Sequence, residues 1–356
     1  MTAPRPGVGQ LLMLGCDGLT PSTDILDWIQ NRDLGGFFVF GPNLGDRDQL
    51  SNLIADLQAA APRLPLFVAM DLEGGRVQLW RRPHWRNLPS ARELGTRLHA
   101  TGDDAELLAL GQEVGAELRS LGVNLDFAPV LDVDTHPTNP IIADRSYGRD
   151  AALVSRAALA FARGLHRAGV IATGKHFPGH GDTEKDSHLT LPVVDQPRDR
   201  IDRVELPPFR AAIDGGIDAL MTAHVRYPAL DSRHPATTSS AICTDLLRGE
   251  LGFEGVLFTD DMAMKGIRQG DDLLGASIAA INAGCDIVLS AFEYADHAPL
   301  LDGLEAALDD GRLAAWRVAE SLARIGPAAV TLAQAEGLDA HARSVAIRLG
   351  GLPSTG

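Results

Sequence analysis

The chain has 356 residues, of which 45% are hydrophobic and 22% charged, a composition typical of a soluble globular enzyme with a large core. Its formal net charge of −15 repels phosphate backbones and anionic lipids, so we expect no nucleic-acid partner and no membrane partner. The N-terminus lacks the apolar stretch of a signal peptide and no apolar run is long enough to span a bilayer, so we expect a cytoplasmic protein.

Eight short, almost wholly apolar segments recur along the chain and are separated by helical patterns. Because such segments suit strands that are buried on both faces, they predict a parallel α/β sheet. The predicted strands are residues 10–14, 36–40, 66–70, 123–128, 170–173, 219–222, 255–258 and 286–289. A count of eight favours a (β/α)8 TIM-type barrel over an open doubly wound sheet.

Four of the intervening segments have a clear helical spacing of apolar residues: 22–31, 106–121, 151–167 and 273–283. Asp150 can cap the third of these helices, and glycines at 169 and 284 follow the last two where a C-terminal glycine belongs. No Pro/Ser-rich or charged tract divides the chain. We therefore expect a single domain over residues 1–356 with a helical C-terminal tail that includes 313–324.

Charged and histidine residues directly follow five of the predicted strands. A single polar residue at such a place is often only a helix cap, but five of them converge where a (β/α)8 barrel carries its active site, at the carboxyl ends of its strands. These residues are Asp71, Asp132, Lys175 with His176, His224, and Asp260 with Asp261.

The segment 175–188 is the densest in chemically active side chains, and its two glycines and proline exclude a helix. It contains neither H-x-H nor H-E-x-x-H, and Cys16, Cys243 and Cys285 are widely spaced, so we expect no metal, no disulfide framework and no cofactor. Lys175 is a candidate Schiff-base nucleophile of an aldolase-type barrel if burial lowers its pKa.

A second chemistry for the same segment is proton transfer. Asp186 and His188 lie two residues apart and share a face if the segment is extended, so the carboxylate can orient the imidazole as a general acid and base. Asp260, held at the end of a buried strand, can supply the carboxylate nucleophile that retaining glycoside hydrolysis requires. For Asp260 the alternative is a helix cap, a role that suits Asp261 better.

The motifs Lys175-His-Phe-Pro-Gly-His-Gly-Asp-Thr and Asp186-Ser-His resemble those of glycoside hydrolase family 3, in particular the bacterial β-N-acetylglucosaminidase branch that recycles peptidoglycan (NagZ-type enzymes). Further segments match along most of the chain: Asp71-Leu-Glu-Gly-Gly-Arg-Val-Gln, Phe127-Ala-Pro-Val-Leu-Asp-Val, Asp144-Arg-Ser-Tyr-Gly, Met221-Thr-Ala-His and Phe258-Thr-Asp-Asp-Met. The resemblance implies a retaining exo-β-N-acetylglucosaminidase that acts on GlcNAc-1,6-anhydro-MurNAc through a covalent glycosyl-aspartate.

By this resemblance Asp260 is the nucleophile, His188 the acid/base and Asp186 its partner. The resemblance assigns the sugar contacts to four further residues, Asp71, Arg145, Lys175 and His176, and we add His224 as a candidate from its place after the sixth predicted strand. The chain departs from the family at Leu79, where relatives carry a substrate-binding arginine; Arg81 or Arg82 can reach the same space.

We expect a monomer, and an enzyme of one domain would have an open pocket; the expected lack of a second domain agrees with a histidine acid. Several alternatives stay open at this point. They are a family 3 β-glucosidase or β-xylosidase, a glycoside phosphorylase, a substrate-assisted N-acetylhexosaminidase, a sugar-binding barrel without activity, and the Schiff-base aldolase that would use Lys175.

Overall fold

The computed structural model of the chain describes residues 7–62, 65–79, 85–136, 138–184, 191–268 and 272–335. Eight parallel strands form one sheet in the order β10-β1-β2-β3-β6-β7-β8-β9. A parallel bridge between Phe258 and Ile287 joins the two ends of this order, so the sheet closes into a (β/α)8 barrel as predicted. The strands are β1 (Leu12–Leu14), β2 (Gly36–Phe38), β3 (Phe67–Met70), β6 (Leu125–Asp126), β7 (Ile171–Phe177), β8 (Ala219–Thr222), β9 (Val256–Phe258) and β10 (Val288–Ser290).

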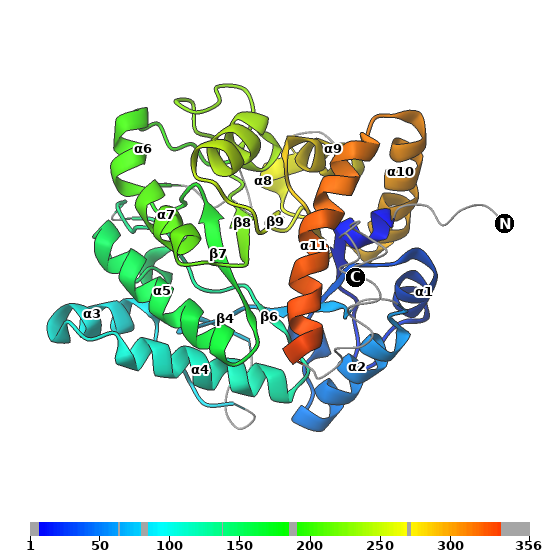
Figure 1. Cartoon of the computed structure of the whole chain (residues 1–356), viewed down its shortest axis with the longest axis horizontal. Helices are drawn as coiled ribbons and strands as arrows, with labels where there is room; N and C mark the ends of the chain where they lie inside the picture. The colour runs from blue at the N-terminus through cyan, green and yellow to red at the C-terminus, as the bar shows by residue number, and fades with distance from the viewer. Residues whose placement is uncertain are drawn as a thin grey trace, which may run out of the picture.

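Helices surround the strands on all sides, as Figure 1 shows. They are α1 (Thr23–Arg32), α2 (Arg47–Ala60), α3 (Ala91–Thr101), α4 (Ala105–Ser120), α5 (Ala151–Arg167), α6 (Arg198–Val204), α7 (Leu206–Asp214), α8 (Lys265–Arg268), α9 (Leu273–Ala283), α10 (His297–Asp310) and α11 (Ala315–Ala335). A π-helical segment, Ala241–Glu250, precedes β9. Among the described residues, no helix combines the length and the apolar character that crossing a bilayer would need.

Helix α5 shows how the local sequence determines where a helix begins and how closely it packs on its neighbour. Its N-cap is Asp150, whose side chain accepts a hydrogen bond from the backbone N–H of Leu153, and its buried stripe faces the barrel. It packs closely on α4 because glycines stand at the crossing. A Cβ at Gly164 would lie 2.4 Å from the carbonyl oxygen of Leu108, so only glycine fits there.

A short antiparallel hairpin, β4 (Leu72–Gly74) and β5 (Val77–Gln78), follows β3 and was absent from the predicted elements. The backbone N–H of Leu72 donates to the Asp126 carboxyl at 3.0 Å, which ties the hairpin to β6. Burial raises the pKa of Asp126 well above its usual range. The hairpin carries its side chains over the carboxyl ends of the strands.

Helix α11 is attached to the barrel through the buried carboxylate of Asp286. One oxygen of this carboxylate lies 2.8 Å from Arg317 and 3.1 Å from Arg324. The other oxygen lies 2.7 Å from Arg248 and accepts a hydrogen bond from the backbone N–H of Leu257 on β9 at 2.9 Å. The helical tail is thus part of the barrel, joined to it where β9 meets β10.

Candidate active site

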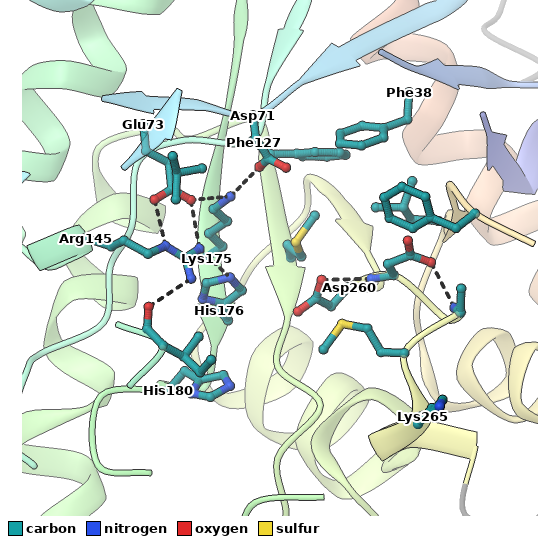
Figure 2. A pocket seen from close by; sticks show the side chains of 18 of the residues that line it. Phe38, Asp71, Glu73, Phe127, Arg145, Lys175, His176, His180, Asp260 and Lys265 are labelled. Atoms are coloured by element: carbon teal, nitrogen blue, oxygen red, sulfur yellow. Dashed lines mark hydrogen bonds and ion pairs between the residues drawn. The ribbon is translucent and has the colours of Figure 1, made fainter. Parts of the chain in front are cut away.

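A cavity of about 510 Å³ opens at the carboxyl ends of the barrel strands. The side chains that line it come from segments far apart in the sequence, as predicted from the strand ends. The charged and histidine residues among them are Asp71, Glu73, Arg145, Lys175, His176, His180, Asp260, Asp261, Lys265 and Glu293. Figure 2 shows Asp260 in the middle of this group, with Lys175 and His176 on one side of it and Lys265 on the other.

A network of charges forms one wall of the cavity (Figure 2). The Lys175 ammonium lies 2.6 Å from a carboxylate oxygen of Asp71 and 2.7 Å from one of Glu73. Both Glu73 oxygens also accept hydrogen bonds at 2.8 Å from the Arg145 guanidinium, a bidentate pair. Burial alone would lower the pKa of Lys175, but Asp71 and Glu73 outweigh it and raise the pKa to about 12.

That pKa argues against the aldolase alternative. A Schiff-base lysine must lose its proton to attack a carbonyl, whereas the Lys175 ammonium is held protonated between two carboxylates. The arrangement instead suits a fixed cation that donates hydrogen bonds. The same pairs hold the Asp71 and Glu73 carboxylates in place beside the cavity.

Two histidines, His176 near the end of β7 and His180 in the loop that follows, contact Asp132, which is fully buried. Its carboxylate lies 2.7 Å from His176 Nδ1 and accepts hydrogen bonds from the backbone N–H groups of His176 and His180. Burial is the main cause that lowers the pKa of His180 to about 4, so this imidazole is neutral at pH 7. His176 Nε2 faces the Arg145 guanidinium at 3.5 Å, which links the end of β7 to the charged wall.

Asp260 lies directly after β9 and keeps its charge despite its enclosure. Burial would raise its pKa, but His224, His176, the backbone N–H of Asp261 and Lys175 favour the carboxylate and lower the pKa to about 2. A carboxylate that is ionised at neutral pH and positioned on a rigid strand end has the properties of a nucleophile.

His224 was predicted to contact substrate, but its side chain is fully buried and lies outside the set that lines the cavity. Its Nδ1 lies 2.7 Å from Thr237 Oγ1, and its Nε2 lies 3.1 Å from the backbone carbonyl oxygen of Asp261. The structure therefore places His224 behind the Asp260–Asp261 turn, where it supports the turn and the charge of Asp260.

Asp261 titrates differently from its neighbour. Its Oδ1 accepts a hydrogen bond from the backbone N–H of Ala263, yet burial and the charge of Asp260 raise its pKa to about 7. The folded chain thus binds this proton more tightly than the unfolded chain. The bound proton therefore adds to the free energy of unfolding below about pH 4, and this contribution is lost as the pH rises towards 7.

This titration predicts a pH-dependent effect of Asp261→Asn. Because asparagine has no proton to lose, we expect the variant to gain stability relative to the parent chain between pH 5 and pH 8, by about 2–4 kcal/mol. Thermal unfolding at a series of pH values measures this difference. Parallel curves of Tm against pH for the two chains would show that Asp261 does not titrate in this window.

The predicted acid/base pair, Asp186 and His188, lies outside the described residues. The described part of the same loop, residues 178–184, follows β7 directly and packs tightly over the barrel. A Cβ at Gly181 would lie 1.7 Å from the carbonyl oxygen of Val133, so glycine is required for this approach. Arg81 and Arg82 also lie outside the described residues, while Leu79 directly follows β5 and is 46% exposed.

Several cavity residues were not identified from the sequence. Glu73 belongs to a family motif but was not predicted to line the site. Its spacing of two from Asp71 was a signal that the two side chains can share one face. Three aromatic rings, one on β2 and two just after β6 and β10, also line the cavity: Phe38, Phe127 and Phe292. Within the described residues, no group of three or more His, Cys, Asp or Glu side chains is arranged to hold a metal ion.

The barrel presents an ionised carboxylate beside fixed hydrogen-bond donors and acceptors and aromatic rings. This arrangement is typical of the class of carbohydrate-processing enzymes. Residues 5–327 match the family described as "Glycosyl hydrolase family 3 N terminal domain". The chain belongs to this family and is a glycoside hydrolase, as its sequence motifs indicated.

Known relatives agree with this assignment. A beta-hexosaminidase of Tolumonas auensis is 40% identical over 297 residues, which cover 83% of this chain and 86% of the relative. Beta-hexosaminidase A of Pseudoalteromonas piscicida is 36% identical over 343 residues, which cover 90% of this chain but only 57% of the relative. The solved family 3 β-N-acetylglucosaminidase of Paenibacillus superposes with a TM-score of 0.88 at 38% identity, covering 98% of this chain and 68% of that one.

Proposed function

We propose that the chain is a retaining exo-β-N-acetylglucosaminidase. The observation that carries this proposal is the position of Asp260, ionised at the middle of the cavity and opposite the wall formed by Asp71, Glu73, Arg145 and Lys175. The activities for which the relatives are named, beta-hexosaminidase and β-N-acetylglucosaminidase, support the choice of sugar.

In this proposal the charged wall binds the terminal sugar. The partly exposed carboxylate of Asp71 accepts hydrogen bonds from ring hydroxyls, Lys175 and Arg145 donate to hydroxyl and acetamido oxygens, and His176 contacts the sugar beside Arg145. Each of these polar side chains is fixed by a partner in the protein before substrate arrives. A sugar that lacks a matching group would leave a buried polar atom unpaired, which gives the wall its selectivity.

The reaction proceeds in two steps. The Asp260 carboxylate attacks the anomeric carbon and forms an ester bond as the bond to the leaving oxygen breaks, while His188, oriented by Asp186, gives that oxygen a proton. Water then attacks the anomeric carbon and gives its proton to His188, which releases the sugar with retained configuration and restores Asp260. By the family resemblance, we propose peptidoglycan-derived muropeptides with a GlcNAc-1,6-anhydro-MurNAc unit as the natural substrate.

The test is the release of p-nitrophenol from the β-N-acetylglucosaminide and from the β-glucoside, measured side by side. We expect a kcat/KM at least about a hundredfold higher for the acetamido sugar, because the site would leave polar groups unpaired against glucose. Preference for glucose or xylose would favour the β-glucosidase or β-xylosidase alternative. Turnover that requires inorganic phosphate would identify a phosphorylase.

A further inference from the structure

A hydrogen-bonded chain of buried side chains lies behind the turn that carries Asp260, outside the cavity. It begins at Thr222 on β8, passes through Thr237 and ends at His224. All three side chains are fully buried, and none of the three residues lines the cavity. They do not reach a sugar bound there, so any effect that they have on the reaction must pass through the protein.

Thr237 lies at the centre of this chain. It belongs to a short 3-10 helix, Ala236–Thr238, in the segment between β8 and the π-helical segment. Its Oγ1 lies 2.7 Å from His224 Nδ1, 2.9 Å from Thr222 Oγ1 and 3.2 Å from the backbone carbonyl oxygen of Ala223. One hydroxyl group therefore has three polar neighbours within hydrogen-bond distance.

Two buried thiols hold the 3-10 helix in place from its other side. Cys243 Sγ donates to the backbone carbonyl oxygen of Ala236 at 3.1 Å, and Cys285 Sγ donates to that of Thr237 at 3.5 Å. These contacts fix the backbone that carries the Thr237 hydroxyl. The hydroxyl is thus positioned against the His224 ring by the fold, before any substrate arrives.

The far side of the His224 ring is joined to the turn after β9. Its Nε2 lies 3.1 Å from the backbone carbonyl oxygen of Asp261, and because a carbonyl oxygen only accepts, Nε2 must carry a proton. The backbone N–H of Asp261 donates to Asp260 Oδ1 at 2.8 Å. The peptide groups on both sides of Asp261 are therefore held, one by His224 and the other by the carboxylate of Asp260 itself.

The Thr237 hydroxyl can serve both protonation states of this imidazole. When the ring is neutral, the hydroxyl donates to Nδ1 and accepts from Thr222; when the ring is charged, it accepts from Nδ1–H and donates to Ala223. In both states the Nε2 proton stays on the Asp261 carbonyl oxygen. A side chain without a hydroxyl serves neither state, and a neutral ring could then carry its proton on Nδ1, which would turn the Nε2 lone pair towards that carbonyl.

We propose that Thr237 is a positioning residue for the nucleophile, and that it acts through His224 by keeping the Nε2 proton on the Asp261 carbonyl oxygen. This inference rests on the proposed function and adds to it a residue that does not contact the sugar. The position of the Asp260 carboxylate relative to the anomeric carbon governs the rate of ester formation. Loss of the Thr237 hydroxyl should therefore slow that step and leave sugar binding unchanged.

The first test removes the hydroxyl and keeps the shape of the side chain. Thr237→Val should lower kcat/KM for p-nitrophenyl β-N-acetylglucosaminide by about fivefold to tenfold, as expected from the loss of one hydrogen bond. The inhibition constant of free N-acetylglucosamine, which measures sugar binding alone, should not change. Thr237→Ser keeps the hydroxyl and should retain most of the parent kcat/KM.

Thr173→Val is the matched control for the exchange of a buried threonine for valine. Thr173 lies on β7, is fully buried, and its hydroxyl has no hydrogen-bond partner among the described residues. The exchange there removes no hydrogen bond, so both kcat/KM and the inhibition constant should equal those of the parent chain. All kinetics are measured well below the Tm of each variant, so that loss of folded protein does not imitate loss of activity.

A double variant tests whether the effect passes through His224. His224→Leu should lower kcat/KM by itself, and adding Thr237→Val to it should cause little further loss, because the ring that the hydroxyl orients is gone. Losses that multiply would overturn the inference, since Thr237 would then act independently of His224. If His224→Leu does not fold, the comparison of Thr237→Val, Thr237→Ser and Thr173→Val still decides.

The outcomes separate this inference from the proposed function. If the parent chain cleaves no N-acetylglucosaminide, the proposed function fails and the inference fails with it. If the parent chain is active and Thr237→Val keeps its kcat/KM, the function stands and the positioning role is overturned. An equal loss in Thr237→Ser also overturns it, because the methyl group would then be responsible, and so does a weaker inhibition constant, because the loss would then lie in sugar binding.

Discussion

Replacing Asp260 with asparagine should lower kcat by about four orders of magnitude or more, as expected when the nucleophile of a covalent mechanism is removed. The amide has nearly the same shape but cannot form the glycosyl ester, so the fold and Tm should change little. Steady-state turnover of an activated aryl N-acetylglucosaminide, together with thermal unfolding, measures both effects. Asp261→Asn is the matched control, because it alters the neighbouring carboxyl and should cost far less activity.

Trapping the intermediate on the parent enzyme separates the covalent route from a substrate-assisted one. Rapid quenching of the parent enzyme during turnover should leave one sugar residue as an ester on the peptide that contains Asp260, and mass spectrometry can locate it. The substrate-assisted route forms no enzyme ester. Near-normal turnover in Asp260→Asn, or an ester on another residue, would contradict the assignment of Asp260 as nucleophile.

Lys175→Met should have the second largest effect and should act on both stability and activity. The change leaves Asp71 without its partner and takes one of two cations from Glu73, so we expect a loss of about 3–5 kcal/mol in the free energy of unfolding. KM should rise because Asp71 loses its fixed position and a hydrogen-bond donor to the sugar disappears. Denaturant unfolding and steady-state kinetics measure the two losses.

A double variant tests whether the stability loss comes from unpaired charge. Lys175→Met combined with Asp71→Asn removes one charge of each sign and leaves the bidentate Glu73–Arg145 pair intact. We expect it to recover much of the lost stability but none of the lost activity, since both groups are proposed to contact the sugar. If the double variant is as unstable as Lys175→Met, the loss would be due to packing around the lysine stem.

The sequence predicted the barrel because the strands are short apolar runs, and charged or histidine residues follow five of them. The same rule located Asp71, Lys175, His176 and Asp260, since strand ends of a barrel converge at one mouth. Strand lengths were harder to predict: β6 spans only Leu125–Asp126, although the apolar run covers 123–128. Backbone hydrogen bonds continue beyond these two residues, from Asn124 to Val68, from Phe127 to Met70 and from Thr173 to Ala128, so the predicted range covers the segment that lies in the barrel wall.

The sequence did not predict that some residues line the cavity, and it did not show that one predicted side chain turns away from it. Both depend on turns of the chain that spacing along the sequence does not reveal. Glu73 reaches the cavity only because the chain turns back in the β4–β5 hairpin. Lys265 and Phe292 lie a few residues beyond their strands, where direction is set by the loop. His224 occupies the same kind of strand-end position as Asp260, yet its side chain turns towards Thr237 and is covered. Position at a strand end therefore predicts proximity to the site, and not contact with the ligand.

The carboxylate of Asp286 has a further consequence for how the barrel opens. Backbone hydrogen bonds from Asp286 and Ile287 to Leu257 and from Thr259 to Ile287 close the barrel here, and a side-chain oxygen of Asp286 binds the amide of Leu257 in addition. Because α11 holds one oxygen of that carboxylate through Arg317 and Arg324, while Arg248 holds the oxygen that binds Leu257, detachment of the helix would remove two of these three cations and loosen the bond to the amide. The rate of amide exchange at Leu257 should then follow the fraying of α11, which couples the last helix to the strand that carries Asp260 in one unit of local unfolding.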